Sequence, residues 1–140
     1  MKYVFPALKI RFNRSAELRR VGRELFQGFD NKRLNVPPPY TEVNGRLAQR
    51  LDTFDSDIET WDLTFRYHAK DIRANSADDW IEAMQATFKD ANITHWAFQC
   101  CGCVAGEIVS ATSENSAYNA SAKFRLTIQR IVNSPLVRYA

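Results

Sequence analysis

Three cysteines and a histidine lie close together at residues 95–103, and together they offer the nitrogen and sulfur donors that bind zinc. The cysteines are Cys100, Cys101 and Cys103. Zinc sites usually take paired ligands that converge in turns, and this sequence has no second pair. On a strand, Cys100 would point to the opposite side from Cys101 and Cys103, so one ion would not collect all three. We therefore expect Cys100 to pack in the core, and we predict no metal and no cofactor.

A cysteine nucleophile needs a base within hydrogen-bond distance, and His68 and His95 are the only histidines. On the strands expected below, both share the polar side with Cys101 and Cys103, so a thiol enzyme is geometrically conceivable. The surrounding residues match no catalytic signature, however, and the chain has no phosphate loop, GxGxxG, GxSxG or HExxH motif. A thiol or zinc enzyme is the weakest of three hypotheses, and we expect a non-catalytic protein.

Acidic side chains are concentrated in residues 52–62. Their alternation from Asp55 onward is like the start of a calcium loop, but the sixth and twelfth positions hold Thr60 and Arg66 where such a loop needs Gly and Glu. The run instead predicts a solvated acidic edge that could dock on a basic protein, as an interaction or inhibitor protein would. The residues assigned to this edge are Asp55, Asp57, Glu59 and Trp61.

The net charge of +3 conceals a segregation of charge along the chain. Residues 1–33 carry nine basic and three acidic side chains, residues 34–114 six basic and thirteen acidic ones, and residues 115–140 four basic and none acidic. If the two ends meet in the fold, they would form one positive face suited to a polyanion.

The leading hypothesis is a small binding module that engages nucleic acid, or a protein that handles it, through this terminal basic surface. Basic residues would hold phosphates, and two aromatic residues would stack on bases. The sequence lacks the RNA-recognition consensus, so it does not distinguish RNA from DNA. The residues assigned to the surface are Lys9, Arg11, Arg19, Arg20, Arg23, Lys123 and Arg125, with Tyr3 and Phe5 for stacking.

In the first half of the chain, alternation predicts a strand over residues 2–12, with Val4, Leu8, Ile10 and Phe12 on one face. Ser15 is expected to cap a helix that ends near residue 28. A proline-rich loop follows over residues 30–40. Residues 41–54 are ambiguous: helical spacing favours a short helix from residue 46, whereas the Asn-Gly pair at 44–45 favours a hairpin turn.

In the second half, strict alternation over residues 60–68 predicts a half-buried strand. Ser76 opens a helix, because a hydroxyl cap and two early aspartates suit its first turn. Residues 93–104 look like a strand with Trp96 on its apolar side, and residues 106–112 are expected to pair back onto it. Residues 121–133 fit a strand or a helix, and their β-branched side chains favour the strand.

This order of elements predicts one α+β domain over residues 1–140, with a mainly antiparallel sheet and two main helices packed on one face. A ferredoxin-like, split βαβ arrangement is one candidate for that pattern. Ordinary composition, with 45% hydrophobic and 25% charged residues, excludes disordered and fibrous classes. No long apolar run is present, and the cysteines do not form a dispersed disulfide framework, so we expect a cytoplasmic protein that does not bind membranes.

Overall fold

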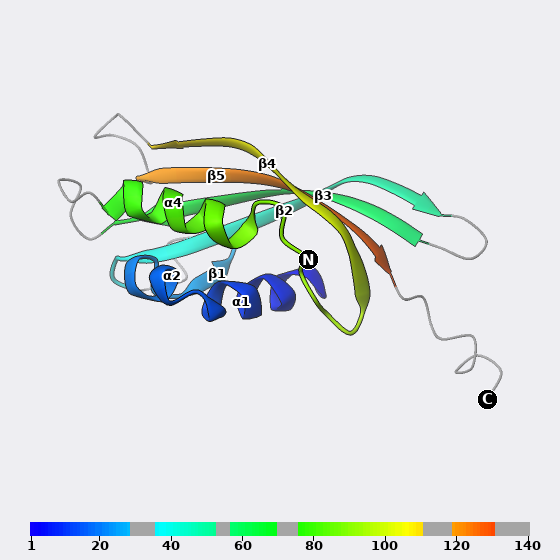
Figure 1. Ribbon diagram of the computed structural model, residues 1–140, viewed down its shortest axis with the longest axis horizontal. Helices are drawn as coiled ribbons and strands as arrows, with labels where there is room; N and C mark the ends of the chain where they lie inside the picture. Colours follow the sequence, from blue (N-terminus) through cyan, green and yellow to red (C-terminus); the bar gives the residue numbers. More distant parts are fainter. Residues whose placement is uncertain (29–35, 53–56, 70–75, 111–118, 131–140) are drawn as a thin grey trace.

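A single five-stranded sheet carries helices on one of its two faces (Figure 1). The computed structural model describes residues 1–28, 36–52, 57–69, 76–110 and 119–130. Within these residues the order of elements is α1 (Val4–Arg14), α2 (Ala16–Val21), β1 (Leu25–Gln27), β2 (Tyr40–Asp52), β3 (Asp57–His68), α4 (Ser76–Phe88), β4 (Phe98–Ser110) and β5 (Ala120–Arg130).

The strands lie in the order β1-β2-β3-β5-β4. Among the described strands, only the short β1 runs parallel to its neighbour, and the other three pairings are antiparallel. The predicted α+β class, with a mainly antiparallel sheet and helices on one face, is therefore confirmed. The described chain opens with two helices, so its order of elements is not the β-α-β-β-α-β order of the ferredoxin-like candidate.

The strand predicted over residues 2–12 is wrong, because this segment forms helix α1. Val4, Leu8 and Phe12 are buried, and their spacing of four residues suits one side of a strand and one side of a helix equally well. Ile10, which belongs to the same side of a strand, is exposed on the helix. Pro6 is tolerated because it lies in the first turn, where its missing N–H has no helical acceptor.

Ser15 caps helix α2 as predicted, and its Oγ accepts a hydrogen bond of 3.2 Å from the Leu18 N–H. The helix ends at Gly22, not near residue 28. Arg23 then adopts a left-handed backbone with φ of 57°, which turns the chain out of the helix and into β1.

The helix favoured from residue 46 is wrong, and so is the alternative turn at Asn44 and Gly45. Both residues lie inside β2, which pairs with β3 along almost its whole length. Gly45 leaves room for the Met1 side chain, which packs directly over it. Partners far along the chain thus decide the structure of a segment whose own spacing is ambiguous.

The predictions for residues 60–68, the helix opening at Ser76 and the final strand are confirmed by β3, α4 and β5. One side of β3 and one side of β5 face the helices and form most of the core. Tyr67 stacks on Trp80 of α4 at 5.4 Å between ring centroids, and Phe65 packs against Phe88 and Phe124. This aromatic core fixes the helices to a single face of the sheet.

Two strands are expected over residues 93–104 and 106–112, but Phe98–Ser110 form the single strand β4 at one edge of the sheet, and residues 111 and 112 lie outside the described residues. Register shifts fall between Cys100 and Gly102 and between Ala105 and Ile108. The first shift reverses the alternation, so Cys100 and Cys103 both lie on the side toward the core. Trp96, expected to be buried, precedes the strand and is 85% exposed.

Candidate functional site

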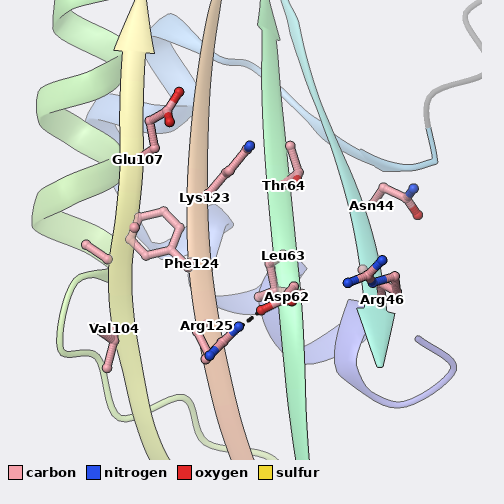
Figure 2. Close-up of a pocket in the computed structure, with 13 residues that line it drawn as sticks. Asn44, Arg46, Asp62, Leu63, Thr64, Val104, Glu107, Lys123, Phe124 and Arg125 are labelled. Carbon is pink, nitrogen blue, oxygen red and sulfur yellow. Dashed lines mark hydrogen bonds and ion pairs between the residues drawn. The ribbon is translucent and has the colours of Figure 1, made fainter. Parts of the chain in front are cut away.

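The sheet face opposite the helices carries a shallow hollow of about 710 Å³ (Figure 2). Strands β2, β3, β4 and β5 all contribute to it. Its lining residues include Asn44 and Arg46 from β2, Asp62 and Thr64 from β3, Lys123 and Arg125 from β5, and Val104 and Glu107 from β4. We call this the open sheet face.

The charges of the open sheet face are partly neutralised within it. Arg125 donates from Nε to Asp62 Oδ1 at 2.9 Å, and this contact raises the pKa of the guanidinium (Figure 2). Lys123 and Glu107 lie nearby on neighbouring strands. The surface therefore mixes both signs of charge and is not a uniformly positive face.

Exposed apolar side chains follow the β4 edge of the same face. Val104 is 61% exposed and Val109 is 42% exposed, and their register partners Arg125 and Ser121 point to the same side of the sheet. Apolar side chains among a few charges are the usual composition of a protein-binding surface.

Among the described residues, the cations assigned to the two ends do not share one face, although Arg130 at the end of β5 lies 4.8 Å from the Tyr3 ring centroid. Lys123 and Arg125 belong to the open sheet face, because neighbouring β5 residues such as Phe124 point into the core. The basic residues of the first segment belong instead to the helices on the opposite side of the sheet and to the turn after them (Figure 1). They are Lys9, Arg11, Arg19, Arg20 and Arg23.

Three of these five cations already have partners. Lys9 Nζ lies 3.5 Å from Glu24, and Arg20 lies 2.7 Å from Glu17. Arg11 donates from Nε to the carbonyl of Thr87 at 3.0 Å, which ties α1 to α4. The side chains of Arg19 and Arg23 have no hydrogen bond or ion pair to any residue that the structure describes.

Tyr3 and Phe5, expected as stacking platforms on a sheet, lie instead at the start of α1. The Tyr3 hydroxyl donates a hydrogen bond to Glu59, and burial together with this carboxylate raises the pKa of Tyr3. Phe5 is partly buried and packs against the core, with Lys9 Nζ 6.0 Å from the ring centroid. Both rings therefore have structural partners within the chain.

The predicted acidic edge is wrong for the residues that can be placed, because Asp57, Glu59 and Trp61 are buried. Arg50 forms two hydrogen bonds to Asp57, of 2.8 and 3.2 Å, and thereby lowers the pKa of that carboxyl. Trp61 donates from Nε1 to Glu59 at 2.9 Å. Asp55 lies outside the described residues. These carboxylates thus bind together the end of β2 and the start of β3 and are not presented to a partner.

The Cys and His residues do not converge on a site. Cys103 is buried, and burial raises the pKa of its thiol to about 12, which disfavours the nucleophilic thiolate. His68 is bound to Glu42 at 2.8 Å, near the end of the sheet opposite Cys101. His95 stacks between Trp96 and Phe98. Among the described residues, no group of three His, Cys, Asp or Glu side chains is placed to hold a metal ion.

Sequence reasoning missed two features of the surface: the exposed Trp96, which is supported by the His95 ring at 5.4 Å, and the apolar β4 edge. The only sequence signal for the edge is Gly102 and Gly106, which lie among the β-bulges that shift the alternation.

Searches with the sequence find no matching family model and no matching curated protein. The fold does match solved structures. One chain from the virion of a native gene transfer agent particle superposes with a TM-score of 0.64, over 92% of this chain and 93% of that chain, at 11% sequence identity. At this identity the likeness establishes a shared fold. In the part of the chain that the structure describes, no helix is long and apolar enough to cross a membrane.

Proposed function

We propose that this protein is a non-catalytic structural subunit of a virion-type particle, and that it works by binding neighbouring protein subunits. The observation that carries the proposal is the end-to-end match in fold with a chain of a gene transfer agent virion. Such a subunit would be made in the cytoplasm and recruited into the particle there.

The open sheet face is the surface we assign to subunit binding. It has a broad hollow, exposed valines on its β4 edge and charges of both signs, and no described helix covers it. Apolar side chains surrounded by polar ones bind protein surfaces well, because burying the former is favourable while the latter select the partner.

The test is whether the chain travels with particles made by the cells that encode it. Particles treated with nuclease and protease would be sedimented through a density gradient, and the chain would be quantified in each fraction by mass spectrometry. We expect it in the particle fraction, and we expect cells lacking it to make incomplete particles visible by electron microscopy. Complete particles from such cells, with the chain confined to slowly sedimenting fractions, would refute the proposal.

A matched pair of variants tests the surface. V104E/V109E places two charges on the open sheet face, and we expect incorporation into particles to fall at least tenfold while the isolated chain stays folded. A86E/E82Q alters exposed residues of α4 on the opposite side of the molecule and should leave incorporation unchanged. Equal incorporation of both variants would remove the open sheet face from the interface.

Nucleic-acid binding is a second candidate, favoured by Arg19 and Arg23, whose side chains have no partner among the described residues. In a fluorescence anisotropy titration with single- and double-stranded RNA and DNA, log K should fall linearly with log salt. Replacing Arg19, Arg20 and Arg23 together should weaken binding to every sequence and reduce that slope. Absence of binding at low salt would exclude this candidate without affecting the particle proposal.

A further inference from the structure

A second hollow lies at the opposite edge of the sheet, where the turn after α2 meets β1 and β2. Its volume is about 460 Å³, and its walls come from the end of α1, from α2, and from β1 and the segment leading into β2. Its lining residues include Asn13, Arg19, Arg23, Phe26 and Tyr40. We call this the arginine pocket.

Positive charge dominates the arginine pocket. Arg19 and Arg23 both line it, and neither side chain has a hydrogen bond or ion pair to a residue that the structure describes. Glu24, the one carboxylate among the described lining residues, lies 3.5 Å from Lys9 Nζ and is offset by that cation. Two like charges held beside one hollow repel each other. An anion bound between them would therefore attract both guanidinium groups and also offset their mutual repulsion.

The backbone of Arg23 provides an independent sign that this side chain serves a purpose. Its φ of 57° is left-handed, a conformation that L-residues avoid and that glycine adopts readily after a helix. The neighbouring glycine at position 22 does not use this freedom, because its own φ is −93°. An arginine kept in an unfavourable backbone conformation at the mouth of a pocket points to a function of the guanidinium.

Aromatic rings form the floor on the strand side. Phe26 is only partly buried, and its ring lies edge-on to Tyr40 at 6.1 Å between centroids. Tyr40 in turn stacks on His68 at 4.4 Å, so the floor is held rigidly in place. The lining thus combines an aromatic ring, two guanidinium groups and the Asn13 amide, which are the groups that bind a planar ligand carrying a negative charge.

We propose that the arginine pocket binds one nucleotide of a single-stranded nucleic acid, with its phosphate at Arg19 and Arg23 and its base against Phe26. The proposal rests on the second candidate function, to which it gives a defined site, and it is independent of membership in a particle. Phosphate, rather than carboxylate, is favoured because paired guanidinium groups and an aromatic floor together match a charged group joined to a planar ring.

The test uses the full-length chain and a fluorescein-labelled single strand of about twelve nucleotides, a length within the range that single-strand binding folds cover. The variant R19Q/R23Q should bind about tenfold more weakly at low salt, and its salt slope should be smaller by about 0.7, since the two guanidinium groups share one phosphate and each phosphate contact on a single strand contributes about 0.7. Circular dichroism would verify that the variant is folded.

The matched control is R20Q, which removes the same charge from the same helix. Arg20 already pairs with Glu17 and does not line the pocket, so binding should change by less than twofold. If R20Q weakens binding as much as R19Q or R23Q does alone, the attraction is diffuse and the pocket is not the site, although the second candidate function would stand.

Two further measurements, with the F26L variant and with polyglutamate as a competitor, identify the ligand. F26L should weaken binding of the normal strand about fivefold and leave an abasic strand of the same length unaffected, because only the normal strand can stack. Polyglutamate of equal charge should compete poorly. If polyglutamate binds through Arg19 and Arg23 as well as the oligonucleotide does, the pocket is a site for acidic peptides and the nucleotide assignment is wrong.

Discussion

Gly22 ends helix α2 at a point where the backbone touches two other elements. A Cβ added there would lie 2.6 Å from Thr41 Oγ1 and 3.1 Å from the Phe12 ring. Thr41 cannot move away freely, because its hydroxyl also accepts a hydrogen bond of 3.1 Å from the Trp80 indole. Close approach, and not backbone freedom, is therefore the reason for glycine at this position.

We expect G22A to lower the free energy of unfolding by about 2 kcal/mol, since overpacking a rigid site costs about 1–3 kcal/mol. Urea denaturation followed by circular dichroism would measure it. G102A is the control, because no atom lies within 4 Å of the Cβ it would add. A loss in G22A no larger than that in G102A would mean that Thr41 and Phe12 adjust without cost.

Arg23 allows the opposite kind of prediction, in which a substitution stabilises the fold and removes a function. R23G relieves the left-handed backbone strain, so the free energy of unfolding should rise by about 1 kcal/mol. The same variant loses a guanidinium from the arginine pocket, and oligonucleotide affinity should fall by severalfold. Thermal melts and anisotropy titrations on one preparation would check both, and a less stable R23G would show that the Arg23 side chain is itself structural.

Among the helices and strands, the successes and failures of sequence reasoning share one cause. Strict alternation in β3 excludes a helix, and that strand was predicted correctly. A spacing of four residues, as in Val4, Leu8 and Phe12 of α1, is compatible with the repeat of a helix and with that of a strand. The predicted strand is wrong there. The same spacing in β2 is resolved only by its pairing with β3, which local residues do not encode.

The candidate site was harder to predict than the fold, because its surfaces depend on which side of the sheet the helices cover. The predicted alternation of the β5 side chains is correct, and it places Lys123 and Arg125 together on one side of the sheet. The error in α1 placed Tyr3 and Phe5 on that side as well. In β4, the bulge between Cys100 and Gly102 reverses the alternation of side chains. A regular strand alternation therefore could not predict that Cys103 lies in the core.

An ion pair between Arg50 and Asp57 joins the end of β2 to the start of β3, and this makes the stability of the strand pair sensitive to acid. Arg50 lowers the pKa of Asp57 in the folded protein, so the ionised carboxylate contributes stability above its unfolded pKa, near 4. This contribution disappears as the pH falls through the lower folded value.

D57N should therefore reduce the free energy of unfolding by about 1 kcal/mol at pH 7, a moderate figure because Arg50 is partly exposed. The difference from the unmodified protein should shrink as the pH falls below 4. Urea unfolding at several pH values would follow it, with D62N as the control for an exposed pair. A difference that does not depend on pH would mean that Asp57 acts through packing and not through its charge.

In the molecule as a whole, the sheet separates two surfaces of different chemistry. The open sheet face combines exposed valines with paired charges, and the helix side and its adjoining edge carry the arginine pocket. Lys123 and Arg125 of β5 therefore lie on a different face from the basic residues of the N-terminal helices, although their charges add in the net total. The distribution of charge along the sequence does not predict this separation, because the topology of the sheet decides which face each charged residue occupies.

This separation predicts opposite effects from two variants that remove equal charge. K123Q/R125Q should leave binding of a single-stranded oligonucleotide within twofold and reduce incorporation into particles, because both side chains lie on the open sheet face. R19Q/R23Q should weaken oligonucleotide binding about tenfold and leave incorporation unchanged. Anisotropy and quantification of the chain in purified particles would measure both effects for each variant. If both variants weaken oligonucleotide binding equally, only long-range charge matters, and the two surfaces are not functionally distinct.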